Sequence, residues 1–456
     1  MSVFVRTTTA SLPAQHSLYP PPYPASGRAW YAVVVLLVAY ISSMIDRVVL
    51  GFLVAPIKET FGVNDVAVSV LGGIAFTVFY TLMGLPAGWL ADRVHRRNMA
   101  VAGVLLWSAA TVYCGFADSY TALFVGRVLV GVGEAVLGPV AYSLLADYFA
   151  PERRATALSA YSMGITIGTG LAVMIAGGAI ALTKTSTVVA VPLLGAVRSW
   201  QYVFILVGAP GLAVALMLLS VQEPQRKGQS HYTSLRSALG FMRLHWKTLV
   251  CHSVGFGCFS VVNQGVGFWL PEMFVRTFGW SRGDIGQAQG LATALGGTLG
   301  LLAGARLTAW FRAQGKTDAA LRTMLTAALG LLGTAVWVPL VSNGTLAAWL
   351  LVPMMFFGFS PYGAATAALQ QLMPNELRGQ AGAMFLLVIN LVGGGAGPVG
   401  ISVLTHSVFG TDAALRYSIS IVTVVSLCAA GVLFVLGLAH FRRSLAVSVQ
   451  SEPNVF

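Results

Sequence analysis

The stretch WYAVVVLLVAYISSMIDRVVLGFLVAP, residues 30–56, surrounds an adjacent acid and base, Asp46 and Arg47, with an almost unbroken run of apolar residues. A helix needs roughly 20 apolar residues to cross the hydrocarbon core of a bilayer, and this stretch is long enough. Across the whole chain, only 9% of the 456 residues are charged and 56% are hydrophobic. Soluble domains have about 25% charged residues, whereas a surface that faces lipid needs few. The stretch therefore predicts one span of a polytopic helical membrane protein.

The rest of the chain repeats this pattern, which predicts an all-α fold with twelve transmembrane helices. The 51 glycines suit such a fold, because small residues let helices pack closely in lipid. The predicted spans are 30–56, 66–91, 98–117, 121–148, 156–182, 199–221, 247–273, 283–310, 321–342, 345–372, 380–406 and 414–440.

A long polar interval divides the twelve spans into two sets of six. The motif PERRATALSA after the fourth span is echoed by PNELRGQAGA after the tenth, which indicates that the two sets are pseudo-symmetric. Two related six-helix bundles are the architecture of transporters whose halves rock about a central site. The predicted order is tail, bundle, linker, bundle and tail, over residues 1–28, 29–221, 222–246, 247–441 and 442–456.

The positive charges predict the orientation of the chain in the membrane. Eighteen Lys and Arg residues fall on the side that carries both tails, whereas six fall on the opposite side. Cytoplasmic loops are enriched in Lys and Arg, so both termini are predicted to be cytoplasmic, at the inner membrane if the cell is bacterial. The net charge of +12 is then an insertion signal spread over short loops, and we expect no nucleic-acid partner.

The sequence carries no pattern typical of an enzyme, a metal site or a cofactor site. The seven histidines are scattered, and the four cysteines lie in apolar stretches without metal-ligand spacing. The sequence has no G-x-x-x-x-G-K-[ST] loop, which argues against ATP-driven transport. We expect a monomer whose partners are the bilayer, a small-molecule substrate and protons. A non-transporting membrane sensor of the same fold is the alternative from another class.

Four ionisable residues lie deep inside predicted spans: Asp46 and Arg47 in the first, Arg127 and Glu134 in the fourth. A charge at the centre of a membrane helix costs on the order of 3 kcal/mol, so each one needs compensation. Arg127 and Glu134 are two helical turns apart and share one face. A static buried ion-pair network is one interpretation. We favour a proton-coupling or substrate-binding set that exchanges partners between transport states, because intramembrane charges typically mark such pathways.

The loop between the second and third spans, GLPAGWLADRVHRRN, fits the G-x-x-x-D-R-x-x-R-R/K signature of the major facilitator superfamily. The signature positions are Gly88, Asp92, Arg93, Arg96 and Arg97. We expect the glycine to permit close helix contact, the acid to accept hydrogen bonds from a neighbouring helix N-terminus, and the arginines to pair with acids at other helix ends as a cytoplasmic gate. Plain positive-inside topology is the alternative. The corresponding loop of the second half has Thr308 where Asp92 stands, and it is predicted to lack this latch.

Three segments of the first half resemble the spinster family of major facilitator transporters: DRVVLGFLVAPIKETFGV, AGWLADRVHRRNMAVAGVLLWSAAT and GRVLVGVGEAVLGPVAYSLLADYFAPERRATALSAYSMG. Ser43 departs from the pattern, since relatives often carry Asn there. The family is associated with sphingolipid export and with lysophospholipid transport. The resemblance implies an amphiphilic lipid-like substrate and proton coupling, as in some members. It also implies a coupling or headgroup-binding role for Asp46, Arg47, Arg127 and Glu134.

The predicted function is proton-coupled secondary transport by alternating access, with the substrate bound between the two bundles. A lipid substrate requires an apolar cavity with few polar groups. The candidate cavity residues are Ser42, Ser43, Asn263, Gln264, Trp269, Tyr362 and Asn390. A proton-coupled organic-anion symporter and a multidrug exporter are the alternatives within the same superfamily.

Overall fold

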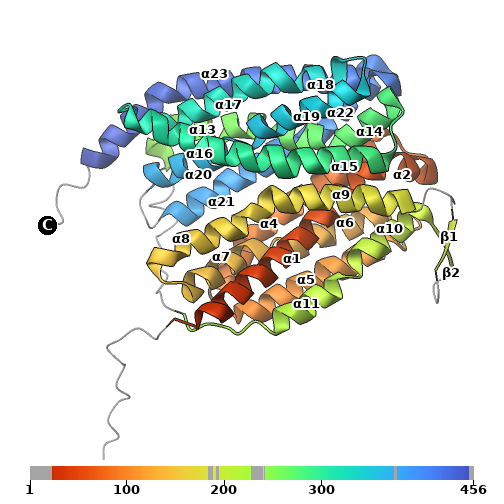
Figure 1. Ribbon diagram of the computed structural model, residues 1–456, viewed down its shortest axis with the longest axis horizontal. Helices are drawn as coiled ribbons and strands as arrows, with labels where there is room; N and C mark the ends of the chain where they lie inside the picture. Colours follow the sequence, from red (N-terminus) through yellow and green to blue (C-terminus); the bar gives the residue numbers. More distant parts are fainter. Residues whose placement is uncertain are drawn as a thin grey trace, which may run out of the picture.

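The computed structural model describes residues 23–182, 188–191, 195–226, 240, 242–373 and 377–450. Its helices run along the long axis of the molecule and form two bundles, α1–α11 and α13–α23 (Figure 1). The start of α1 and the end of α23 lie at one end, which we call the linker end because residues 222–226 also lie there. The opposite end carries a β-hairpin and is called the hairpin end. Most of the predicted linker, residues 227–239 and 241, falls outside the described residues.

Most spans of the first bundle consist of two consecutive helices joined by a short break. The break between the first two helices lies at Leu53, three residues before a proline. The helices are α1 Ser26–Phe52, α2 Val54–Phe61, α3 Asp65–Gly72, α4 Ile74–Ala91, α5 Arg96–Cys114, α6 Tyr120–Glu134, α7 Leu137–Tyr148, α8 Pro151–Ser162, α9 Ile167–Leu182, α10 Ser199–Gly208 and α11 Gly211–Leu219.

Three spans of the second bundle contain π-helical turns next to the contact between the bundles. These turns cover Val261–Val266, Thr293–Gly297 and Asn390–Ala396. An added residue in a π turn re-aims the neighbouring side chains, and such turns are frequent at functional sites. The helices are α13 Trp246–Ser260, α14 Gly267–Phe278, α15 Arg282–Ala292, α16 Thr298–Ala313, α17 Ala319–Ala335, α18 Trp337–Leu340, α19 Gly344–Phe359, α20 Tyr362–Leu372, α21 Arg378–Ile389, α22 Gly397–Val403 and α23 Leu415–Gln450.

Within the described residues, eleven helical segments are long and apolar enough to cross a membrane. The predicted span that is not among them, 98–117, is the helix α5. Its first turn is Arg96, Arg97 and Asn98, which lowers the mean hydropathy of this short helix. Helix α5 nevertheless packs against α6, α10 and α11 as a member of the first bundle. The twelve-helix arrangement therefore holds, with one span that is marginal by hydropathy.

The connection between α9 and α10 forms a β-hairpin, which was not expected from the sequence. Strand β1, Val188–Val191, pairs antiparallel with β2, Gly195–Arg198. Val188, Val189 and Val191 favour an extended backbone because their side chains are β-branched. Gly195 begins the second strand with a φ of 78°, a conformation that glycine adopts without strain.

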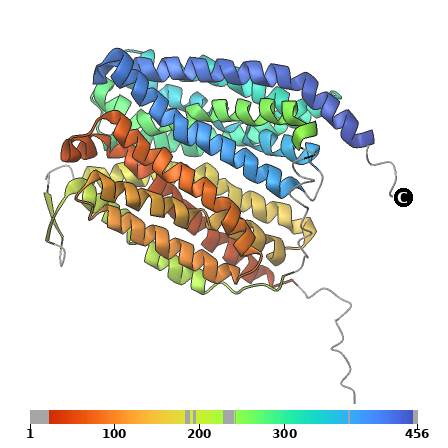
Figure 2. The same cartoon turned by 180° about the vertical axis from the view of Figure 1, so that it is seen from behind.

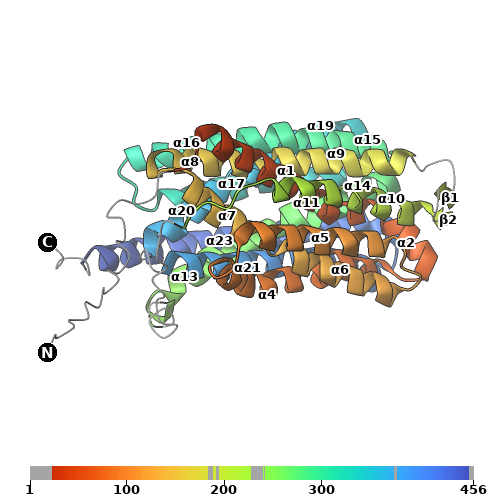
Figure 3. The same cartoon turned by 90° about the horizontal axis from the view of Figure 1, so that it is seen from below.

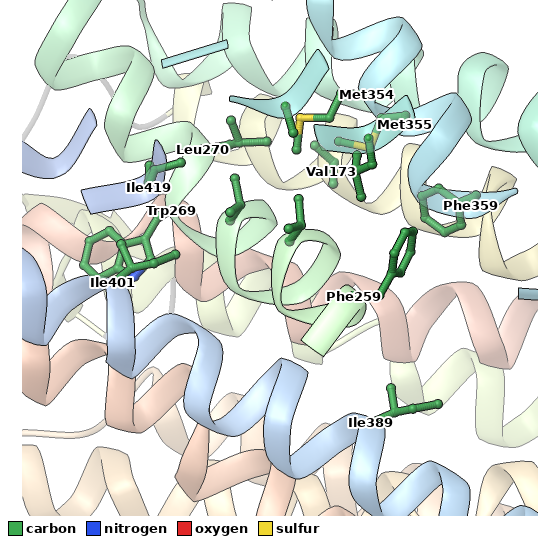
Figure 4. Packing of buried hydrophobic residues seen from close by; sticks show 14 of the residues in the cluster. Val173, Phe259, Trp269, Leu270, Met354, Met355, Phe359, Ile389, Ile401 and Ile419 are labelled. Carbon is green, nitrogen blue, oxygen red and sulfur yellow. The ribbon is translucent and has the colours of Figure 1, made fainter. Parts of the chain in front are cut away.

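The two bundles contact each other most extensively along two pairs of spans, and α1 also packs against α14. On one side α9 lies against α15, where a Cβ on Gly177 would lie only 2.9 Å from the Cα of Gly286. On the other side α4 lies along α21 and the π turn that follows it (Figures 2 and 3). The interior of the second bundle is apolar, and the Trp269 side chain packs beside Ile401 (Figure 4). These contacts leave a space between the bundles at mid-length.

Candidate functional site

A cavity of about 270 Å³ lies between the two bundles. Arg47 is the charged side chain among the described residues that line it. The first bundle contributes Tyr40, Met44, Arg47, Val48, Phe52, Gly72, Phe76, Thr77, Ile165, Thr169 and Val173. The second contributes Asn263, Gln264, Gly267, Phe268, Pro271, Gln289, Thr293, Met355, Phe359, Tyr362, Asn390, Gly394 and Pro398.

Four of the predicted cavity residues, Asn263, Gln264, Tyr362 and Asn390, belong to this lining. The three carboxamides lie on π turns and line the cavity. The Asn263 amide donates to the carbonyl of Gly358 at 2.6 Å, while its Oδ1 atom is buried without a hydrogen-bond partner among the described residues. The second bundle thus supplies polar groups to the cavity without supplying charge.

The other three predicted cavity residues, Ser42, Ser43 and Trp269, lie outside the lining, so these predictions are corrected. Residues three or four apart share a helix face, and the cavity face of α1 carries Tyr40 and Met44 instead. The Ser43 hydroxyl is buried and donates to the carbonyl of Tyr40 at 3.0 Å. The Trp269 indole is fully buried and donates to a backbone carbonyl of α22 at 2.9 Å.

Arg47 and Glu134 form a salt bridge between the first and fourth spans. The Arg47 Nε atom lies 2.6 Å from Glu134 Oε2. The Glu134 side chain is fully buried, whereas the Arg47 side chain is 26% exposed and faces the cavity. The rings of Tyr80 and Phe76 flank the guanidinium, with centroids 4.4 and 5.0 Å from Cζ, which adds cation–π attraction. Arg47 therefore connects a buried acid to the cavity.

Asp46 and Arg127 are also close together, but they do not form a side-chain ion pair. The Arg127 Nη1 atom donates to the backbone carbonyl of Asp46 at 3.0 Å. Both side chains are buried. Asp46 Oδ1 and two nitrogens of Arg127 have no hydrogen-bond partner within the described part of the chain. The structure thus brings together all four predicted intramembrane charges on α1 and α6, within one bundle, and their role remains a prediction.

At the linker end, Arg96 of the loop motif is the centre of a buried cluster. Its Nε atom donates to Glu223 at 2.6 Å and its Nη1 atom donates to Asp147. The backbone N–H of Arg97 donates to the second oxygen of Glu223 at 2.9 Å. Burial by itself raises the pKa of Glu223, but the bonds from Arg96 and Arg97 outweigh burial and hold the pKa below its ordinary value. The motif thus anchors the linker to the first bundle.

The remaining motif residues differ from the expectations. A Cβ on Gly88 would meet no described residue within 4 Å, so Gly88 makes no close helix contact with the described part of the chain in this conformation. Asp92 follows α4, and its backbone carbonyl accepts a hydrogen bond from Arg226 of the linker. Arg93 lies over the ring of Trp89, with Cζ 3.9 Å from the centroid. Because Arg226 belongs to the distant linker, the spacing of the motif residues could not identify it as a partner of this loop.

A second ionic cluster at the hairpin end was not predicted. We define the hairpin-end ion cluster as Lys58, Asp65, Glu272, Arg276 and Asp412. Lys58 contacts Asp65 at 2.7 Å and Asp412 at 2.9 Å, and Arg276 contacts Asp65 at 2.7 Å and Glu272 at 2.9 Å. The Lys58–Asp412 and Arg276–Asp65 pairs join the first bundle to the second. The Lys58–Asp65 and Arg276–Glu272 pairs are local in the sequence, but the partners that join the bundles lie hundreds of residues apart.

Comparisons with known proteins agree with this architecture. Residues 36–398 match the model of the Major Facilitator Superfamily. The chain is 31% identical over 424 residues to an MFS-type efflux pump of Mycolicibacterium smegmatis, covering 92% of this chain and 94% of that protein. It is 25% identical over 390 residues to the sphingosine-1-phosphate transporter SPNS2 of Xenopus tropicalis, with coverages of 77% and 72%. A crystal structure of a bacterial homologue of the human lysosomal transporter spinster, inward-facing and occupied, has a TM-score of 0.74 at 25% identity, covering 93% and 98%.

Proposed function

This chain belongs to the major facilitator superfamily and is a spinster-like transporter, and on that premise we propose that it moves a lipid-like amphiphile by proton-coupled alternating access. The observation that carries the proposal is Arg47, which reaches from the buried acid Glu134 into a cavity lined by both bundles. The rest of the lining is uncharged. Such a cavity suits a substrate with one anionic group and a long apolar part.

We infer the substrate class from the two kinds of side chain that line the cavity, one cationic and the others apolar or uncharged polar. The Arg47 guanidinium can bind a phosphate through paired, charge-assisted hydrogen bonds. Phe268, Met355 and Phe359 supply apolar surface from the second bundle for a hydrocarbon chain. A sphingolipid or lysophospholipid has both features, and the transporter SPNS2 is named for such a substrate.

We infer proton coupling because an anionic headgroup and Glu134 would compete for the guanidinium of Arg47. An anionic headgroup that binds Arg47 draws it away from Glu134, and a buried carboxylate without its partner is costly. Uptake of a proton by Glu134 removes that cost. Binding of the anion and binding of the proton therefore favour each other, and by linkage the effect is reciprocal. Asp46, buried beside Arg127, is the second candidate proton carrier.

Alternating access requires that the hairpin end opens and closes. The hairpin-end ion cluster supports this proposal, because two of its ion pairs join the bundles and must break for that end to open. With both termini in the cytoplasm, as the distribution of Lys and Arg indicates, the hairpin end faces away from the cytoplasm.

The proposal is tested by reconstitution into proteoliposomes with an imposed pH gradient. The protein should move a fluorescent lysophospholipid or sphingoid phosphate faster with the gradient than without it. Glu134→Gln and Asp46→Asn should abolish the gradient-driven part, while Glu59→Gln, which changes an exposed carboxylate of α2, should behave as wild type. Unchanged gradient-driven flux in both buried variants would overturn the coupling, and preference for small hydrophilic carboxylates would overturn the lipid substrate.

A second candidate function is export of diverse apolar compounds. It is favoured by the 31% identity to an efflux pump over 92% of this chain. In the same liposomes, this function predicts transport of a lipophilic dye that lysophospholipid does not inhibit. The first function predicts that lysophospholipid competes with any transported dye at the Arg47 cavity.

A further inference from the structure

A groove of about 450 Å³ lies on the second bundle, between α16, α17 and α19. It is on the far side of α19 from the transport cavity: Met355 and Phe359 face the cavity, whereas Phe356 and Phe357 face the groove. Its floor is formed where Gly304 meets the backbone of α19, since a Cβ there would lie 1.8 Å from the carbonyl oxygen of Ser360. The absence of a side chain at Gly304 lets α16 pack directly against the backbone at the end of α19.

Arg306 lies on the rim of this groove, on a helix that crosses the membrane. Its side chain is exposed, and it makes no hydrogen bond or ion pair with another described residue. Helix α16 ends at Ala313, so Arg306 lies roughly 10 Å from the helix end at 1.5 Å per residue. Trp310, one turn further on, is 55% exposed, and exposed tryptophans prefer the membrane interface. The long Arg306 side chain thus reaches the level of the lipid headgroups.

We propose that this groove binds an anionic phospholipid of the leaflet at the linker end, with its phosphate on Arg306 and one acyl chain in the groove. An unpaired guanidinium at the level of the headgroups attracts an anion, and the apolar groove beside it suits a hydrocarbon chain. The bilayer covers this surface, so one molecule that meets both requirements is a membrane lipid. Basic sites between membrane helices on the cytoplasmic side typically select anionic headgroups. The site is separate from the transport cavity and does not depend on which substrate is transported.

The test is lipid retention by the full-length protein. The protein is equilibrated in mixed micelles with equal amounts of phosphatidylglycerol and phosphatidylcholine, and retained lipid is counted by native mass spectrometry. Wild type should retain one phosphatidylglycerol in preference to phosphatidylcholine. Arg306→Gln should lower that preference about fivefold, as expected from roughly 1 kcal/mol per cationic side chain. Arg312→Gln, an exposed cation on the same helix outside the groove lining, should retain the wild-type preference.

A second variant separates the two parts of the site. Ala327→Phe places a ring inside the groove and should reduce phosphatidylglycerol retention while leaving Arg306 in place. Equal phosphatidylglycerol preference in wild type and Arg306→Gln would overturn the proposal. Displacement of phosphatidylglycerol from this site by equimolar lysophospholipid would also overturn it, because the groove would then bind transported amphiphile. Failure of the transport proposal would leave the retention pattern unchanged.

Discussion

Replacement of Asp65 by Asn should open the hairpin end of the transporter. Asp65 begins α3, and its side chain is 2% exposed. It accepts charge-assisted bonds from Lys58 at 2.7 Å and from Arg276 at 2.7 and 3.0 Å. The contact to Arg276 crosses between the bundles, so it exists only while the hairpin end is closed. Loss of the bond to Arg276 therefore destabilises only the closed state, whereas the contact with Lys58, which lies within the first bundle, is weakened in both states.

The expected magnitude is about 2 kcal/mol. Hydrogen bonds to charged groups contribute roughly 1.5–3 kcal/mol each, but asparagine keeps one acceptor oxygen. Arg276 also keeps its bond to Glu272 at 2.9 Å, so its charge is not left unpaired. A change of about 2 kcal/mol shifts the ratio of open to closed molecules about thirtyfold. An open population of about 1% would then rise to about a quarter.

The populations can be measured by pulsed electron paramagnetic resonance. Spin labels at Glu59 of the first bundle and Val408 of the second report the separation of the bundles at the hairpin end, in a background where the exposed Cys428 is replaced by Ser. Asp118→Asn, an exposed acid at the same end, is the matched control. If Asp65→Asn shows the same distance distribution as wild type and control, the ion cluster does not hold the hairpin end closed.

Three further outcomes are expected. Glu223→Gln should destabilise the protein by about 1–3 kcal/mol in thermal unfolding relative to the exposed control Glu152→Gln. Because the Glu223 pKa is lowered, the stability that its carboxylate contributes is fully present above pH 4.5, its ordinary pKa, and is lost only as the pH falls through the lowered pKa. A loss of this stability already near pH 6 would contradict the argument. Gly177→Leu should slow transport and weaken bundle contact, whereas Gly178→Leu, with nothing within 4 Å of its Cβ, should not; equal effects would contradict the close approach. Burial lowers the pKa of Lys58, but Asp65 and Asp412 raise it above 10.5 overall. Lys58 therefore loses its charge only as the pH rises through that raised pKa. The distance between the spin labels at Glu59 and Val408 should stay constant from about pH 6 to 9.

The fold could be predicted largely because lipid imposes a simple rule on the sequence. A spanning helix must be apolar for about 20 residues, so hydropathy locates it without knowledge of its neighbours. Helix α5 shows where the rule weakens, since its charged first turn lies at the membrane surface and lowers the average over a short helix. The β-hairpin was missed because a short valine-rich run between two spans gives the same signal as an apolar loop.

The site could be predicted only in part, because hydropathy reports membrane depth but not helix rotation. Asp46, Arg47, Arg127 and Glu134 were identified because charge is rare at mid-membrane. Ser43 was placed in the cavity wrongly, since one residue along α1 is a rotation of 100°, enough to turn a side chain from cavity to core. The partners of Arg96 and the cross-bundle partner of Lys58, Asp412, were not predictable because they lie in distant parts of the sequence, and spacing carries no information about them.

The positions of the two ionic groups constrain how coupling can work. Two of the ion pairs at the hairpin end, Lys58–Asp412 and Arg276–Asp65, cross between the bundles, so rigid rocking breaks them directly. The Arg47–Glu134 bridge lies entirely within the first bundle, so the same rocking leaves it intact. The exchange of partners expected from the sequence therefore cannot be driven by tilting of the bundles alone. It requires a local event on α1, either an anion that binds Arg47 from the cavity or a bend at the break beside Leu53. Such an event changes the relative free energy of the two states only if the substrate contacts differ between them. The uncharged cavity lining of the second bundle would supply those contacts if it closed over the substrate.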